Sequence, residues 1–122
     1  MKLKFTASAV IAAALTLTAC ATSPTGRNQV LLYSETQLAQ MGDQAFTGMK
    51  EELKISNKAV QNSYVECVAN AITAQVPATV FNGQWEVVVF DDEQVNAFAL
   101  PGGKIGVYTG LLNVAENQHQ LA

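Results

Sequence analysis

The stretch "QWEVVVFDDEQVNAFALPGGKIGVYTG", residues 84–110, decides the fold class of this chain. Its beginning is rich in β-branched and aromatic residues that alternate between two faces, which predicts a strand over residues 85–90. Two more short strands are predicted at residues 97–100 and 104–108, because the Pro-Gly-Gly sequence at 101–103 favours a tight turn. The stretch therefore predicts a small antiparallel sheet or hairpin.

Helical patterns flank these strands. Residues 34–53 begin with Ser34 as a candidate N-cap and Gln37 three positions later, followed by apolar residues at helical spacing. A second helix is predicted from Ser56 or Asn57 to before Pro77, and a third from near Leu111. The expected apolar faces are Leu38, Met41, Ala45, Met49 and Leu53 on the first helix and Val60, Tyr64, Cys67, Val68, Ala71, Ile72 and Val76 on the second. The order of helices and strands predicts an α+β fold.

The N-terminal sequence has the layout of a secretory signal: basic residues, an apolar run over 5–19 and small residues before Cys20. The run is shorter than the roughly 20 residues that a membrane-spanning helix needs. "LTAC", residues 17–20, resembles the bacterial lipobox. We therefore expect residues 1–19 to be a lipoprotein signal peptide, residues 20–33 a lipidated cysteine and flexible tether, and residues 34–122 a folded domain.

Lipidation of Cys20 would make a membrane the first partner of the protein, since several buried acyl chains give stable anchoring. Ala21 is not aspartate, which by resemblance to Gram-negative lipoprotein sorting implies the periplasmic face of the outer membrane. Without residues 1–19 the formal net charge changes from −3 to −5, because Lys2 and Lys4 are lost. No basic stripe remains, so nucleic acid is excluded as a partner.

Several patterns that resemble functional motifs fail on spacing. Lys104 in "GGKIGVYTG" is followed by Ile and a strand, whereas a P-loop requires Ser or Thr and a helix. The acids in residues 90–96 lack the ligand spacing of a calcium loop and are interpreted as a solvated loop. Cys67 has no thiol partner if Cys20 is lipidated, and is predicted to be a small buried hydrophobe.

His119 is the only histidine of the chain. A zinc site needs three or four ligands at tight spacing, and catalysis by a nucleophile needs a base and an orienting group. His119 is therefore interpreted as a residue on the polar face of the last helix. No catalytic residue and no metal ligand is assigned to any position of this chain.

Four stretches in order, "TGRNQ", "SETQLAQMG", "VNAFALPGGKIGVYTGLL" and "AENQHQLA", resemble the zinc metallopeptidase family that includes the CAAX prenyl protease, the heat-shock protease HtpX and periplasmic bacterial lipoprotein peptidases. In that family the last stretch leads within a few residues into His-Glu-x-x-His, where two His bind zinc and the Glu acts as general base. That motif is absent here. The resemblance thus implies that residues 34–122 are the N-terminal part of a zinc metallopeptidase domain and that the chain ends before the motif. It also implies zinc as the cofactor of the full-length family, with none bound by this chain.

The resemblance also implies that the hairpin over residues 96–107 lies beside the active-site cleft. An exposed strand edge can pair with an extended peptide whatever its sequence. Asn96, Ala97, Phe98 and Ala99 are accordingly the candidate substrate-binding residues. The alternative is ordinary hairpin packing with Phe98 in the core, and the sequence leaves both open.

These observations favour the N-terminal part of a membrane-anchored zinc metalloendopeptidase that acts on unfolded or envelope proteins in quality control and is catalytically incomplete as given. The alternative is a small non-enzymatic outer-membrane lipoprotein that binds a partner through its hairpin edge. The apolar stripe of the last helix stops without packing partners, and this argues against the alternative.

Overall fold

The computed structural model describes residues 20–22, 28–30 and 32–122. Its contacts divide the chain into two units, Met1–Ser34 and Glu35–Ala122. The predicted signal peptide, residues 1–19, lies outside the described residues. Within the first unit, β1 (Cys20–Thr22) pairs antiparallel with β2 (Asn28–Val30). Strands thus form within a segment expected to lack regular structure, because backbone hydrogen bonds between extended segments depend little on side chains.

The second unit contains four helices and three strands. These are α2 (Glu35–Glu52), α3 (Ala59–Thr73), β3 (Glu86–Phe90), β4 (Ala97–Leu100), β5 (Lys104–Tyr108), α4 (Thr109–Val114) and α5 (Gln118–Leu121). The predicted α+β class is confirmed. Both predicted hairpin strands have their expected bounds, because the turn between them is a strong local signal.

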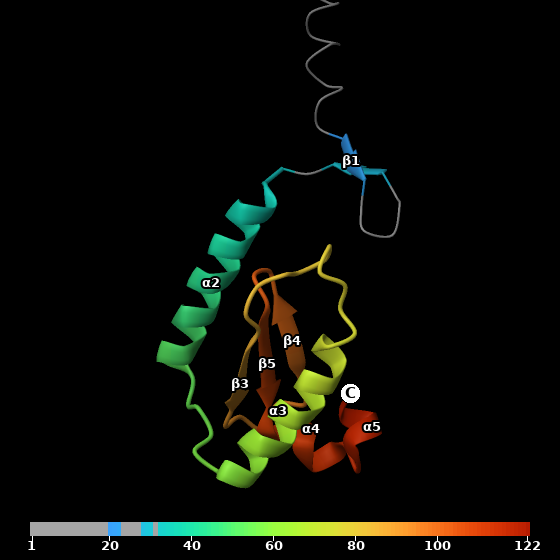
Figure 1. Cartoon of the computed structure of the whole chain (residues 1–122). Coiled ribbons are helices and arrows are strands. Elements are labelled where there is room, and N and C mark those ends of the chain that lie inside the picture. Colours follow the sequence, from blue (N-terminus) through green and yellow to red (C-terminus); the bar gives the residue numbers. More distant parts are fainter. Residues whose placement is uncertain (1–19, 23–27, 31) are drawn as a thin grey trace, which may run out of the picture. The chain divides into compact units, whose positions relative to one another are not determined.

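The three strands form a mixed sheet with β5 in the centre, in the order β3-β5-β4. β4 is antiparallel to β5, as a hairpin requires, but β3 is parallel to β5. The expected antiparallel sheet is corrected in this respect. The reason lies in the connection: residues 91–96 carry the chain from β3 past the central position to the far edge, and β5 then returns between the two earlier strands (Figure 1).

Helix α2 covers one face of the sheet through an aromatic cluster. Phe46 of α2 meets Phe90 and Tyr108 there, with ring centroids 6.1 Å apart for Phe46 and Phe90 and 5.8 Å apart for Phe90 and Tyr108. The buried positions of α2 are Gly42 and Phe46, whereas Met41 is 47% exposed. Met49 and Leu53 of the predicted apolar face pack against this cluster as expected. Met41 and Ala45 are exposed instead, because Phe46 is the residue of α2 that enters the cluster.

Helix α3 lies on the opposite face, where Val65, Val89 and Val107 form a second buried cluster (Figure 1). The helix turns Val65 and Ala69 to the sheet. Val60 is 83% exposed, so it is not part of the buried face. Cys67 is exposed, and its predicted role as a buried hydrophobe is wrong because the packing of α3 on β3 selects a different side of the helix.

The predicted last helix is two helices, α4 and α5, separated at residues 115–117. Ala115 adopts an extended backbone with ψ 111° after α4. Asn117 then caps α5, because its side-chain oxygen accepts hydrogen bonds from the backbone N–H groups of His119 and Gln120, each at 3.0 Å. The apolar stripe read across this region thus belongs to two short helices. His119 is exposed on α5.

Candidate functional site

The outer edge of β4 presents free backbone groups. Ala97 is opposite Val107 and Ala99 is opposite Ile105, while the Tyr108 N–H donates to the Asn96 carbonyl at 3.0 Å. Hydrogen-bonded and non-hydrogen-bonded pairs alternate in an antiparallel ladder. The N–H and C=O groups of Ala97 and Ala99 therefore point away from β5 and out of the sheet, and no described residue hydrogen-bonds them.

The side chains of the four candidate residues separate onto different sides. Phe98 belongs to the aromatic cluster, with its ring centroid 6.3 Å from that of Phe46 and 6.2 Å from that of Phe90. Gly106 makes room for it, since a Cβ at that position would overlap the Phe98 ring. Ordinary core packing thus describes the Phe98 side chain, and only its backbone belongs to the edge. Asn96 is exposed just before β4.

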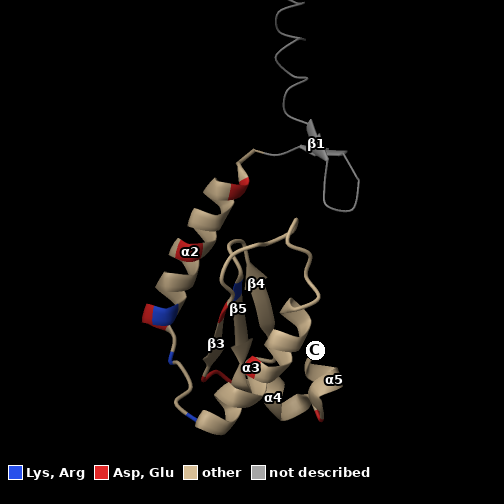
Figure 2. Ribbon diagram, in the orientation of Figure 1, with Lys and Arg blue, Asp and Glu red and all other residues tan. Residues whose placement is uncertain are grey.

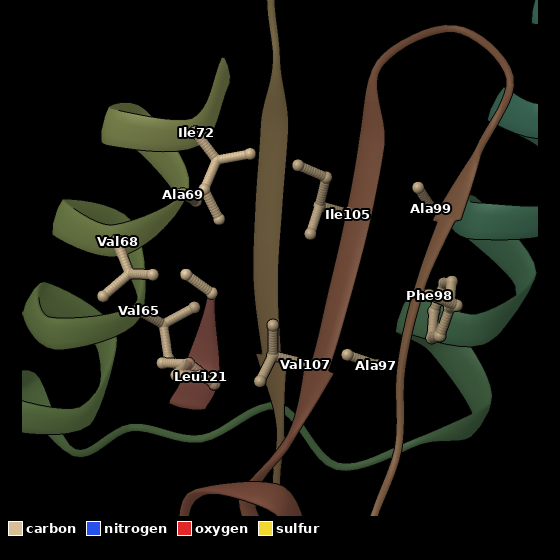
Figure 3. A pocket seen from close by; sticks show the side chains of 11 residues that line it. Val65, Val68, Ala69, Ile72, Ala97, Phe98, Ala99, Ile105, Val107 and Leu121 are labelled. Atoms are coloured by element: carbon tan, nitrogen blue, oxygen red, sulfur yellow. The ribbon is translucent and has the colours of Figure 1, made fainter. Parts of the chain in front are cut away.

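Ala97 and Ala99 face the α3 side of the sheet, where the structure has an apolar groove of about 310 Å³. Figure 3 shows the α3 side chains along one wall and the β5 and β4 side chains along the other. The lining residues are Val65, Val68, Ala69, Ile72, Ala97, Phe98, Ala99, Ile105, Val107, Leu121 and Ala122. Because the β4 positions are alanines, the groove stays open beneath the strand edge.

The hairpin is held against α2 by a close backbone approach. Gly42 lies so near the turn that a Cβ there would be 2.9 Å from the carbonyl carbon of Pro101. Gly102 and Gly103 in the turn have φ of 89° and 74°, the left-handed region that glycine tolerates. The turn that leads from β4 into β5 is thereby fixed in place by the helix.

A network of ion pairs between α2 and the sheet supports the same arrangement. Lys104 Nζ lies 3.1 Å from Glu86 Oε1 and 3.4 Å from Asp43 Oδ1, and Lys50 Nζ donates to Glu86 Oε2 at 2.7 Å. The hydrogen bond from Lys50 lowers the pKa of Glu86, and the hydrogen bond to Glu86 raises the pKa of Lys104. Sequence reasoning missed these residues, because the charges pair only after α2 and the strands have packed.

The acidic loop over residues 90–96 is anchored at the start of α4. The buried Thr109 hydroxyl accepts from the Asp92 N–H at 3.1 Å and donates to the Asp92 carbonyl at 3.0 Å. Asp91 pairs with Lys54 at 3.2 Å. These contacts position the loop that enters β4.

The described residues do not fit a zinc site. No three His, Cys, Asp or Glu side chains come together in the part of the chain that the structure describes. The one histidine is exposed on α5, and the sequence contains no His-Glu-x-x-His. No step of a zinc-dependent reaction is therefore assigned to the residues of this chain.

Residues 55–122 match the family model described as Peptidase family M48. The chain belongs to this family. M48 enzymes are zinc-dependent metallopeptidases, so the predicted resemblance to a zinc metallopeptidase family is confirmed. The match contains α3, the sheet and both C-terminal helices.

Among curated proteins the chain is similar to metalloendopeptidases named OMA1. It is 34% identical over 102 residues to "Metalloendopeptidase OMA1, mitochondrial" of Danio rerio, covering 80% of this chain and 21% of that protein. The Arabidopsis thaliana protein, "Mitochondrial metalloendopeptidase OMA1", is 35% identical over 92 residues, covering 72% and 18%. The Homo sapiens protein is 29% identical over 109 residues, covering 80% and 20%. The chain thus spans about a fifth of the length of these relatives.

The expected location at the periplasmic face of the outer membrane is contradicted by these relatives, whose names place them in mitochondria. A basic start followed by an apolar run is shared by several kinds of targeting segment, so it does not fix the compartment. The non-enzymatic alternative loses its outer-membrane setting with this correction. Lipidation of Cys20 stays a prediction.

None of the helices in the described ranges is long and apolar enough to cross a membrane.

Proposed function

We propose that this chain forms the substrate-holding sheet of a zinc metalloendopeptidase that cleaves unfolded polypeptides. The observation that supports the proposal is the outer edge of β4, where the N–H and C=O groups of Ala97 and Ala99 point out of the sheet. An extended substrate can add to such an edge as a further strand. Backbone pairing of this kind grips many sequences, which suits an enzyme that acts on unfolded protein.

The residues around the edge have positioning roles in this proposal. The contact between Gly42 and Pro101 and the ion pairs of Lys104 keep the hairpin rigid. A rigid strand loses less entropy when a substrate pairs with it. Zinc, when bound in the family, supplies an activated water for peptide-bond hydrolysis, and the residues of this chain hold the peptide.

Strand pairing is tested with Ala99→Pro, which removes the outward N–H without removing a bond to β5. Ala99→Ser is the matched control, because it keeps the N–H and a small side chain. The assay is the affinity of the whole chain for a reduced, carboxymethylated protein. Loss of one backbone hydrogen bond, about 1 kcal/mol, should weaken binding by Ala99→Pro about fivefold. Equal affinities of the two variants would refute pairing at this edge.

The reaction class is tested separately. The chain alone should not cleave casein, because the zinc ligands of the family are not among its residues. Chelator-sensitive cleavage by the purified chain would contradict this assignment. An enzyme that cleaves unfolded polypeptides is suited to protein quality control, and we propose this role for the full-length enzyme.

Attachment to a membrane through a lipidated Cys20 is also part of the proposal. The supporting observation is the sequence "LTAC" after a short apolar run. Cys20→Ala should move the protein from the membrane fraction to the soluble fraction, with Cys67→Ala as the control. Retention of the Cys20→Ala variant in the membrane fraction would count against lipidation.

A further inference from the structure

The second edge of the sheet, along β3, is only partly covered. The segment before α3 forms an isolated antiparallel bridge there, in which the Ser56 N–H donates to the Val89 carbonyl at 2.8 Å and the Asp91 N–H donates to the Lys54 carbonyl at 2.7 Å. After Ser56 the chain leaves the edge, and α3 begins at Ala59. The part of β3 that precedes Val89 is therefore open along the described chain.

Val87 directs its backbone groups out of this open part. The Glu86 N–H donates to the Gly103 carbonyl at 2.8 Å, so Glu86 and Val88 form the bonds of the parallel ladder with β5. The backbone groups of Val87, like those of Val89, point away from β5. The N–H and C=O of Val87 have no hydrogen-bond partner among the described residues. Together they can pair with the backbone of one more extended segment.

A polar cavity of about 310 Å³ lies beside Val87. Asn62, Glu66 and Asn70 line it from α3, where their spacing of four residues places them on one face. Trp85, Glu86, Val87 and Val89 line it from the strand. The floor is thus a strand edge and the wall is a row of polar side chains. We call this cavity the β3 notch.

The β3 notch carries an unpaired negative charge. Glu66 is the only charged residue of α3, and Figure 2 shows that helix in tan apart from one acidic position. No described cation pairs with Glu66, whereas Glu86 is neutralised by Lys50 and Lys104. A positively charged side chain on a bound segment would therefore gain an interaction with Glu66.

We propose that the β3 notch binds a short extended peptide that carries a lysine or arginine. Its backbone pairs with Val87, and its basic side chain lies against Glu66 between the two asparagines. A simple metal ion is less suited to this site, because Glu86 is already paired with two lysines and the remaining carboxylate, Glu66, offers too few ligands. This peptide site is distinct from the β4 edge and does not rest on the function proposed for that edge.

The test measures peptide binding to the whole chain by fluorescence of Trp85, the only tryptophan of the protein, which lines the notch. The probe is a blocked hexapeptide of alternating threonine and lysine, and the control peptide alternates threonine and glutamate. Val87→Pro removes the outward N–H and no hydrogen bond to β5, since proline is tolerated at a sheet edge, but it also loses part of the Val87 side-chain packing. Val87→Ala is its control, because it loses similar side-chain packing but keeps the N–H.

The lysine peptide should bind more tightly than the glutamate peptide. Val87→Pro should weaken its binding about fivefold relative to Val87→Ala, as expected for one backbone hydrogen bond. Glu66→Gln should weaken the lysine peptide about twofold to fivefold, as expected for an exposed ion pair. Glu116→Gln, at an exposed acid that does not line the notch, should change nothing. Absence of a fluorescence response, equal binding by the two Val87 variants, or an equal loss of binding in Glu116→Gln would overturn the proposal.

Discussion

Gly42→Ala tests the contact that fixes the hairpin against α2. A Cβ at Gly42 would lie 2.9 Å from the carbonyl carbon of Pro101, 3.2 Å from its nitrogen and closer still to its carbonyl oxygen. These are backbone atoms of a turn, which cannot rotate away as a side chain could. The methyl group therefore fits only if α2 moves away from the turn, and this movement would loosen the packing of Phe46 in the aromatic cluster.

Gly48 on the same helix provides the matched control, because nothing lies within 4 Å of a Cβ there. Gly48→Ala should stabilise the protein by about 0.5–1 kcal/mol through helix propensity alone. Gly42→Ala gains the same propensity but should lose about 1–3 kcal/mol from overpacking. The free energies of unfolding of the two variants should thus differ by about 1–3 kcal/mol, with each 1 kcal/mol shifting Tm by about 4–8 °C in a domain of this size.

The assay is urea and thermal unfolding of both variants, followed by circular dichroism and by the fluorescence of Trp85. The expected order of stability is Gly48→Ala, then the parent chain, then Gly42→Ala. Equal stabilisation by the two substitutions would refute the reasoning, because it would show that α2 does not approach the Pro101 turn closely.

Three further predictions concern other contacts of the fold. Urea titrations should show that the free energy of unfolding falls in acid as the pH drops through the lowered pKa of Glu86, because this carboxylate stabilises the fold only while it is ionised. Lys50→Met should make this decline with pH less steep, and an equally steep decline would contradict the ion pair. Thr109→Val should lower the free energy of unfolding by about 1–3 kcal/mol because the Asp92 N–H loses its acceptor, whereas Thr109→Ser should retain most of it; equal losses would argue against this hydrogen bond. Asn117→Ala should weaken α5 by about 1 kcal/mol, seen as faster amide hydrogen exchange in that helix, with Asn117→Asp as control; unchanged exchange would refute the cap.

The parts of the fold that depend on local chemistry could be predicted from the sequence. The bounds of β4 and β5 follow from the Pro101-Gly102-Gly103 turn. The buried side of α3 could not be predicted in the same way, because its sequence offers apolar residues on more than one side. Contact with Val89 and Val107 selects Val65 and leaves Cys67 exposed.

In the candidate site too, some features follow from local sequence and others only from the packing of the strands. Residues 96–99 could be identified from their sequence, but the register with β5 decides that Ala97 and Ala99 present their backbone groups outward. The strand order decides that β4 is an edge at all. Register and strand order both depend on residues far apart in the sequence. The ion pair between Glu86 and Lys104 does so as well, because it joins neighbouring parallel strands.

The central position of β5 has a consequence for how the protein is made. Both of its neighbours precede it in the chain, so β3 and β4 emerge from the ribosome before the strand that joins them. Until residues 104–108 have emerged, the apolar sequence "VVVF" at 87–90 has no strand of this sheet to pair with. Such segments are prone to aggregate while exposed. A nascent chain of this protein should therefore depend on protection while the residues between Phe90 and Tyr108 emerge from the ribosome.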